Sequence, residues 1–224
     1  MIFKTDQVLS FCSSQLLGDG HNVNDTSLVI SHSEKQLPYL KWKKEIADSL
    51  SLHTSPIVSK QLNSTFGKQT LFTFCVSGIG SSLRLLKDVP IQNLVDHLDE
   101  IGLLLWWLDD GSLTVYEKRN STSISRFGYL CTEGFSLEIN QKLSEVLMFK
   151  FGISTNIHID RGGVNNPDII YYRLYLNAMS MRKLIDIIRM YIPYIPKCML
   201  YKLNMDYRPT RIKSSTNFIQ FYNF

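Results

Sequence analysis

The stretch LLLWWLDDGS, residues 103–112, joins six apolar residues to two aspartates and a glycine near the middle of the 224-residue chain. The apolar run favours a buried helix, and glycine commonly follows a helix because it adopts positive φ without steric cost. The aspartates are harder to explain, because a helix C-terminus already carries about half a negative charge. A carboxylate there is disfavoured by roughly 0.3–1 kcal/mol unless another group compensates it.

A second acidic helix end lies 91 residues earlier, in FCSSQLLGDG, where Asp19 occupies the position of Asp110. Two apolar helices that pack together would bring these charges into one place. Carboxylates and free main-chain carbonyls are the oxygen ligands that Mg²⁺ accepts, with water and phosphate completing its coordination. The paired helix ends therefore predict a divalent-cation site.

The two halves of the chain repeat one order of elements, helix, hairpin, helix, hairpin, helix, without a Pro/Gly/Ser linker between them. Periodicity predicts helices and strands in each half. In the first half we expect helices over 5–18, 37–50 and 81–88, and strands over 27–33, 56–62 and 71–77. In the second we expect helices over 90–110, 136–151 and 179–191, and strands over 112–118, 121–132, 154–160 and 169–177. The pattern predicts an α+β fold made by internal duplication, with halves at 1–98 and 99–224.

Composition narrows the class of protein. The four cysteines lie far apart, which argues against a zinc site or a disulfide framework. The longest apolar run falls far below the roughly 18 residues of a membrane span, and the N-terminus does not resemble a secretory signal. The chain has a formal charge of +4, and the basic segment 197–213 carries an excess of the same size, which suits a polyanion or a solvated tail.

The two acidic stretches resemble the signature helices of the LAGLIDADG homing endonucleases, in the single-chain form with both motifs on one polypeptide. The second motif is similar to the W-[FL]-x-D-D-G variant of intron-encoded members. The segments ISHSEKQLPYLKWKKEI, LKDVP and IPKCMLYKL occur in the order expected for that subgroup. The resemblance runs from about residue 8 to residue 204 and implies two αββαββα units, whose curved antiparallel sheets form a DNA-binding saddle.

The resemblance also implies the site residues. Asp19 and Asp110, with the carbonyls of Gly18 and Asp109, would hold Mg²⁺ over the scissile phosphates, and Lys87 and Lys202 would be the basic catalytic residues. The side chain of Asp109 is expected to be a surface carboxylate at the helix end. We expect the helices to cross with the bulky Leu105, Trp106 and Trp107 opposite small residues of the first helix, without close backbone contact.

Strand and turn residues are candidates for DNA contact, because a β-ribbon fits the major groove. We expect about half of the following to touch DNA: Asn22, Asn24, His32, Lys60, Gln61, Asn63, Lys68, Tyr116, Lys118, Arg119, Ser123, Arg126, His158, Arg161 and Arg173.

The implied function is a site-specific, Mg²⁺-dependent double-stranded DNA endonuclease that acts as a monomer and does not bind membranes. An intron maturase, which binds RNA as a splicing cofactor on the same fold, is the alternative. A DNA-binding regulator on this fold would bring an added helix-turn-helix, for which there is no room. We expect an intracellular location, in an organelle or in a bacterial or phage-infected cytoplasm.

Overall fold

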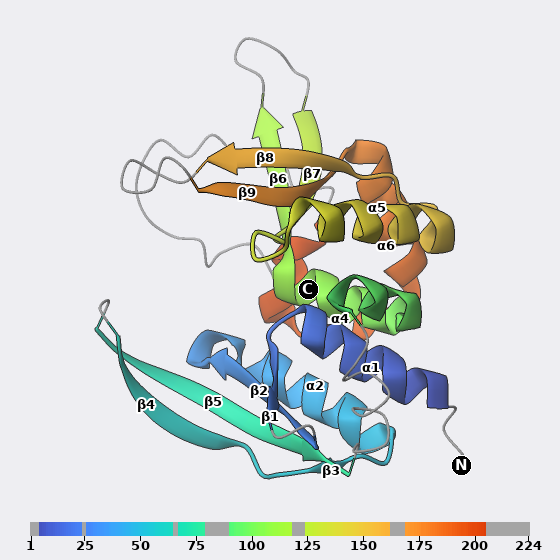
Figure 1. The fold of residues 1–224 in the computed structure, drawn as a ribbon. Helices are drawn as coiled ribbons and strands as arrows, with labels where there is room; N and C mark the ends of the chain where they lie inside the picture. Colours follow the sequence, from blue (N-terminus) through green and yellow to red (C-terminus); the bar gives the residue numbers. More distant parts are fainter. Residues whose placement is uncertain are drawn as a thin grey trace.

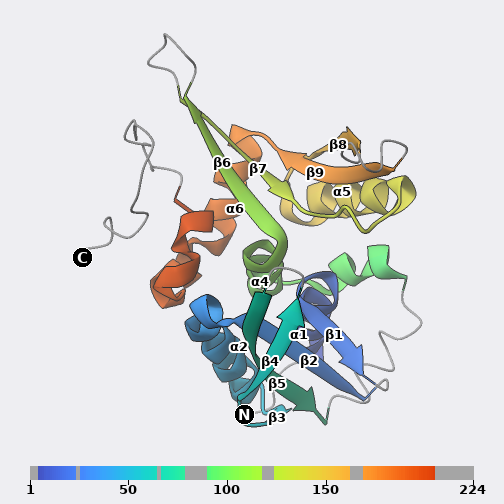
Figure 2. The ribbon, with the colours of Figure 1, turned by 90° about the vertical axis from the view of Figure 1, so that its left-hand side faces the viewer.

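The structure, a computed structural model, describes residues 5–23, 26–64, 67–78, 90–117, 124–161 and 169–204. It contains two antiparallel sheets, one from each half of the chain, with helices between and behind them (Figure 1). The strands lie toward one side of the molecule, and Figure 2 views that side directly. No helix among the described residues is long and apolar enough to cross a membrane. Residues 81–88, where a short helix is expected, lie outside the described part of the chain.

In the first half, one sheet packs against two helices. Its elements are α1 (Thr5–Leu17), β1 (Gly20–Val23), β2 (Ser27–Ser33), η1 (Glu34–Gln36), α2 (Leu37–Ser49), β3 (His53–Thr54), β4 (Val58–Ser64) and β5 (Gly67–Ser77). The strand order is β1-β2-β5-β3, and β4 also pairs with β5. Leu28 and Ile30 of β2, with Phe74 of β5, are fully or almost fully buried, as are Tyr39 and Leu40 of α2. Alternate residues of each strand therefore form the core face.

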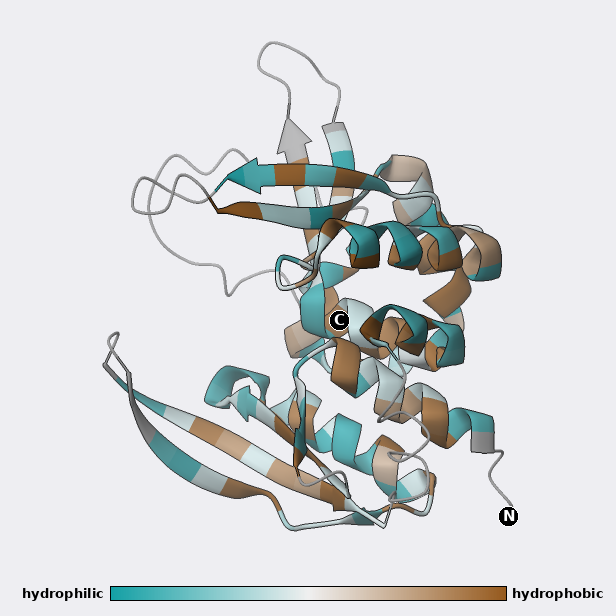
Figure 3. Ribbon diagram, in the orientation of Figure 1, coloured by the Kyte–Doolittle hydropathy of each residue, from teal (hydrophilic) through white to brown (hydrophobic). Residues whose placement is uncertain are grey.

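The second half repeats the arrangement of the first. Its elements are η2 (Ile91–His97), α4 (Glu100–Asp110), β6 (Gly111–Glu117), β7 (Ile124–Leu130), α5 (Leu137–Phe151), β8 (Asn156–Arg161), β9 (Ile170–Leu176), α6 (Ala178–Ile188), η3 (Arg189–Tyr194) and η4 (Lys197–Lys202). The strand order is β6-β7-β9-β8. Ser136 caps α5 by accepting from the Ile139 N–H, and Gly152 ends it at φ 65°. Apolar and polar residues alternate along β8 and β9 (Figure 3).

The helices α1 and α4 lie side by side between the two sheets (Figures 1 and 2). Every residue of α4 from Gly102 to Leu108 is buried. The prediction of one helix over 90–110 is wrong, because η2 ends at His97 and α4 begins at Glu100. Asp99 separates them: its carboxylate accepts from the Gly102 N–H at 2.8 Å and from the Ser10 hydroxyl of α1 at 2.6 Å.

The helices also approach more closely than bulky residues alone would allow. A Cβ added to Gly102 would collide with the Ser10 hydroxyl and lie 3.2 Å from the Ser10 carbonyl oxygen. A Cβ on Gly18 would lie 2.6 Å from Oδ2 of Asp109. The expectation of no close backbone contact is therefore wrong at Gly102, whereas Gly18 lies against the side chain of Asp109. The duplicated α+β fold with two antiparallel sheets is confirmed; the boundary at residue 98 stays a prediction.

Candidate active site at the ends of the paired helices

Both acidic helix ends meet at the centre of the molecule, between the sheets. Asp19 follows α1, and Asp109 and Asp110 are the last residues of α4. The Asp19 N–H donates to Oδ2 of Asp109 at 3.3 Å, across 90 residues of sequence. Packing of the two apolar helices thus brings the acidic helix ends together, and the Asp109 carboxylate joins Asp19 and Asp110 there.

Asp109 is the buried member of the three, so the expectation of a surface carboxylate is wrong. Its side chain and that of Lys43 are both 0% exposed. Lys43 Nζ lies 2.7 Å from each of the Asp109 oxygens, and the Tyr39 hydroxyl donates to Oδ1 at 2.8 Å. Both partners come from α2 of the other half. With its oxygens satisfied in this way, the carboxylate locks α4 to α2 and to the Asp19 backbone.

Lys202 is brought to the site, as the resemblance implies. Its Nζ donates to the carbonyl oxygens of Leu108 and Asp109, at 2.6 and 2.7 Å. The Trp107 indole donates to the Lys202 carbonyl at 3.1 Å, which holds η4 against α4. The ammonium therefore occupies the Asp109 carbonyl that was expected to bind metal. Lys87, the second predicted lysine, lies outside the described residues.

The other two acids, Asp19 and Asp110, are short of positive charge. Burial and the nearby charges of Asp109 and Asp19 raise the pKa of Asp110 from 3.8 to about 7. Burial and Asp109 also raise the pKa of Asp19, although Lys43 and Lys202 partly offset this. Burial lowers the pKa of Lys202 below its usual value. When all are ionised, three carboxylates face two ammonium groups, and one negative charge is left for a cation to balance.

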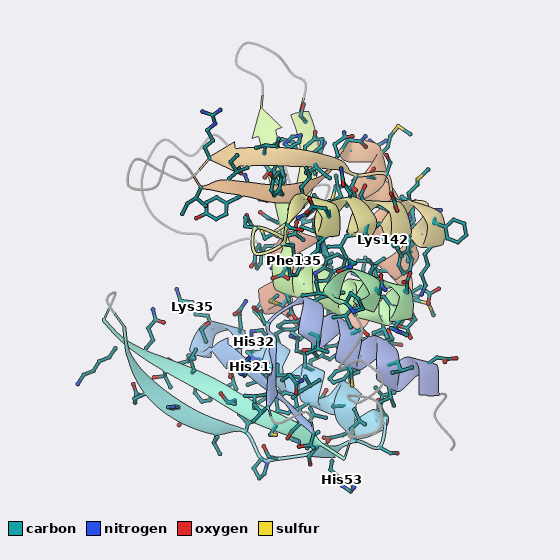
Figure 4. All side chains as sticks on the ribbon, in the orientation of Figure 1. His21, His32, Lys35, His53, Phe135 and Lys142 are labelled. Carbon is teal, nitrogen blue, oxygen red and sulfur yellow. The ribbon has the colours of Figure 1, made fainter. Side chains whose placement is uncertain are left out.

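His32 also faces the site, although it was expected to contact DNA. It is 4% exposed, and its Nδ1 lies 3.7 Å from Oδ2 of Asp19. Burial, and then the charge of Lys43, lower its pKa to about 4. Figure 4 labels it on β2, near His21 of β1. An imidazole buried in this way has little surface to offer to DNA.

Strand register sorts the DNA-contact candidates of the first half by face. Residues paired across antiparallel strands share a face, so Lys60, opposite Leu71, lies on the face away from Phe74. Gln61, opposite Thr70, and Lys68 share the face of Phe74. Asn22 pairs with the buried Leu28. The placement of Asn24 and of the Asn63 side chain lies outside what the structure describes.

The open face of the second sheet carries an aromatic cluster with one arginine. His158 stacks on Tyr175 at 4.3 Å and shares a hydrogen bond of 3.2 Å with Tyr129. The Arg173 guanidinium lies 4.6 Å from the centre of the Tyr129 ring and is paired with Asp160 and Glu133. Its charge is therefore already balanced by protein carboxylates.

The remaining DNA-contact candidates of the second half lie on the other face of their strands or outside what the structure describes. Arg126 pairs with Val115, and Arg161 with Ile170, so both lie on the opposite side of their strands from Tyr129 and Arg173. The positions of Lys118, Arg119 and Ser123 and of the Tyr116 side chain lie outside what the structure describes.

Tyr39 and Lys43 were missed by the sequence reasoning. A signal was present, because Tyr39, Lys43 and Ala47 recur at helical spacing on the buried face of α2. A lysine in such a stripe requires a buried partner.

Comparison with known proteins identifies the family. The model of the LAGLIDADG DNA endonuclease family matches residues 14–184. The chain belongs to this family. That match contains Asp19, Asp110 and both sheets.

The chain is also similar to individual proteins and to a solved structure. The chain is 30% identical over 117 residues to the "Probable intron-encoded DNA endonuclease 3" of Mycosarcoma maydis, which covers 52% of this chain and 72% of that protein. It is 22% identical over 214 residues to "Protein RecA" of Mycolicibacterium flavescens, covering 89% of this chain but only 47% of that protein. Among solved structures, the homing endonuclease I-WcaI bound to its DNA recognition sequence has a TM-score of 0.66 at 18% identity, covering 91% of this chain and 88% of that one. This likeness concerns the fold.

Proposed function

We propose that this LAGLIDADG protein is a site-specific endonuclease that hydrolyses both strands of double-stranded DNA with the help of Mg²⁺. The observation that carries the proposal is the meeting of Asp19 and Asp110 at the ends of α1 and α4, between two sheets that share one open side. The family match and the intron-encoded relative favour DNA cleavage over the maturase alternative. We further propose a monomer, since one chain supplies both acids.

The residues present fit a divalent cation. Burial, and then the charge of Asp109, raise the pKa values of Asp19 and Asp110, so a bound cation would favour the ionised form of both carboxylates. These oxygens, with the carbonyl of Gly18, form a hard donor set of the kind that Mg²⁺ accepts. Bound metal would supply an activated water and stabilise charge developing on the phosphate.

The chain's own residues would divide the remaining work. Asp19 would serve one strand and Asp110 the other. Lys202 Nζ, held by two carbonyls of α4, would place a positive charge near the reacting phosphate. Asp109 would hold both helix ends in register through Lys43, Tyr39 and the Asp19 N–H.

Asparagine substitution of Asp19 or of Asp110 tests the proposal. Asp19→Asn and Asp110→Asn should each lower double-strand cleavage by on the order of 10²–10³-fold or more, because asparagine cannot supply the ligand charge. Binding of the same duplex should change little. The duplex would be selected from a library of long DNA sequences incubated with wild-type protein and Mg²⁺.

The control is Asp186→Asn. Asp186 is an exposed acid of α6 that is paired with Arg189, and this variant should cleave DNA normally. Full cleavage by both site variants, or recovery of cleaved sequences without any common site, would refute the proposal.

A further inference from the structure

The two acidic helix ends are not equivalent, because an imidazole accompanies one of them. His32 of β2 lies beside Asp19, and its Nδ1 is 3.7 Å from the carboxylate oxygen Oδ2. This separation is too long for a hydrogen bond. It is short enough for one cation to contact both atoms, since metal bonds to imidazole nitrogen and carboxylate oxygen measure about 2.0–2.2 Å.

The His32 ring is built into the protein and is not a surface group that happens to lie near an acid. Its side chain is 2% exposed, against 44% for Asp19. The Tyr39 ring packs on it at 5.0 Å between centres. The Gln36 side chain is a hydrogen-bonding neighbour of the ring. The buried Nε2 nevertheless has no hydrogen-bond partner of normal geometry among the described residues. The other nitrogen, Nδ1, is aimed at the carboxylate.

Asp109 does not belong to this pair, although its carboxylate lies within 4.8 Å of the same ligand atoms. It is fully buried, and its oxygens already accept from Lys43 and Tyr39. The side-chain ligand atoms left for an ion at this end are therefore Nδ1 of His32 and the carboxylate of Asp19, beside the carbonyl of Gly18.

The corresponding position of the second half carries no imidazole. Gly20 pairs with Ile30, and Gly111 pairs with Leu130. Two residues beyond these partners stand His32 and Thr132. The Thr132 hydroxyl is buried and donates to Asn140 Oδ1 at 2.5 Å, so it is turned to its own half's core.

We propose that His32 Nδ1 and the Asp19 carboxylate together bind a first-row transition ion such as Mn²⁺ or Co²⁺, which gives the two halves of the active site different metal preferences. Imidazole suits such ions, whereas Mg²⁺ is bound by oxygen ligands. The end at Asp110 has oxygen donors and no imidazole, so it keeps a preference for hard cations. The inference rests on the proposed function, because it concerns metal at the same acids.

The test measures metal binding by the full-length protein without DNA. Co²⁺ would be titrated into wild-type protein and into His32→Gln, followed by visible absorption and calorimetry, and the same titrations would be repeated with Mg²⁺. Loss of a nitrogen ligand should weaken Co²⁺ binding by at least about tenfold, with Mg²⁺ binding changed less than about threefold. If His32→Gln folds poorly, Asp19→Asn replaces it in the test, because position 19 is more exposed. It should cause a similar loss of Co²⁺ affinity.

His21→Gln is the matched control, because His21 is an exposed histidine on the neighbouring strand β1. It should leave Co²⁺ binding unchanged. Co²⁺ affinity within twofold of wild type in folded His32→Gln would overturn the proposal. Equal weakening of Co²⁺ and Mg²⁺ would also overturn it, since a merely structural role predicts that result.

Strand-resolved cleavage separates this inference from the proposed function. In Mn²⁺, His32→Gln should slow cutting of one strand relative to the other, whereas in Mg²⁺ the ratio of the two rates should stay close to that of wild type. A wild-type protein that cuts no DNA with any metal refutes only the proposed function. The Co²⁺ titration without DNA still tests whether His32 binds metal.

Discussion

The Asp109 side chain, at the end of α4, is enclosed by donors from the first half of the molecule. Lys43 and Tyr39 come from α2, and the Asp19 N–H comes from the end of α1. Removing one partner of a buried ion pair leaves an uncompensated charge, which costs more than the pair itself contributes. Asp109 and Lys43 therefore form a unit whose members depend on each other.

Lys43→Met should destabilise the protein by about 3–5 kcal/mol, because the Asp109 carboxylate would stay buried without its cation. Urea unfolding would measure the change. Lys44→Met is the matched control on the same helix: Lys44 is 25% exposed and pairs with the surface residue Asp48, so its loss should cost at most about 1 kcal/mol.

The double variant Lys43→Met/Asp109→Leu should recover much of the loss, since it removes both charges together. Equal losses for Lys43→Met and Lys44→Met would contradict the burial of this ion pair.

Asp110 should make the metal-free protein less stable at high pH. Its folded pKa of about 7 lies above the value of 3.8 for an unfolded chain, so ionisation is disfavoured in the folded state. The destabilisation is complete above about pH 7 and disappears as pH falls toward 4. Asp110→Asn should therefore raise Tm at pH 8, by roughly 2–4 °C per kcal/mol of the removed cost of ionising a buried carboxyl beside Asp109 and Asp19.

The advantage of Asp110→Asn should vanish near pH 4, where wild-type Asp110 is protonated in both states. Thermal melts in the presence of a chelator would give the change in Tm at pH 8 and near pH 4. A gain in Tm that is independent of pH would show that ionisation of Asp110 is not the cause.

At the scale of elements, the helix pair is set by close contacts at its two ends. Gly102 of α4 lies against Ser10 of α1, and Gly18 lies against Asp109. Asp99 reinforces the first contact, because its N–H also donates to the Ser10 hydroxyl oxygen at 2.9 Å. The position of each acid therefore depends on the contact beside it and on another contact at the far end of the helix pair.

Gly102→Ala should cost about 1–3 kcal/mol, because its Cβ would collide with the Ser10 hydroxyl and lie 3.1 Å from a Leu98 methyl carbon. The shift of α4 relative to α1 should also reduce cleavage. Gly134→Ala is the control, since its Cβ would meet no atom within 4 Å, and its effect should stay within about 0.5 kcal/mol. Equal stabilities of the two variants, measured in urea, would contradict the close approach.

At the scale of the whole molecule, the two sheets expose different chemistry on their open faces. The first sheet presents Lys60, whose side chain is exposed and forms no ion pair with another described residue. The second presents Arg173, which is already paired with two carboxylates. A free ammonium suits phosphate, whereas a guanidinium held by acids and stacked on Tyr129 suits a fixed base contact.

Lys60→Ala should weaken binding to all duplexes and reduce the slope of log K against log salt by about 0.9, as expected for one lost phosphate contact. Arg173→Ala should change the slope less and relax selectivity at one position of the target. Lys142→Ala on α5, away from the open faces (Figure 4), should change neither. Equal salt slopes for Lys60→Ala and wild type would refute the phosphate contact.

Much of the architecture could be predicted from local sequence. Periodic apolar residues define α1, α2, α4 and α5, and alternation defines the paired strands, because both patterns reflect which side of an element is buried. The acids at two helix ends followed from the same reading, since a residue next to a helix end stays there however the helices pack. The break at Asp99 was missed because a capping contact to Ser10 across 89 residues decides it.

The sequence by itself determined the duplicated fold, the family and the pair of acids, because each of these is written in short-range patterns of residue type. The tertiary structure alone decided how the charges are shared. Asp109 is neutralised by Lys43, 66 residues away, and its carbonyl is bound by Lys202, 93 residues away. It also turned His32 inward to face Asp19. A carboxylate's charge, pKa and capacity to bind metal depend on such neighbours, and only the packed chain brings them together.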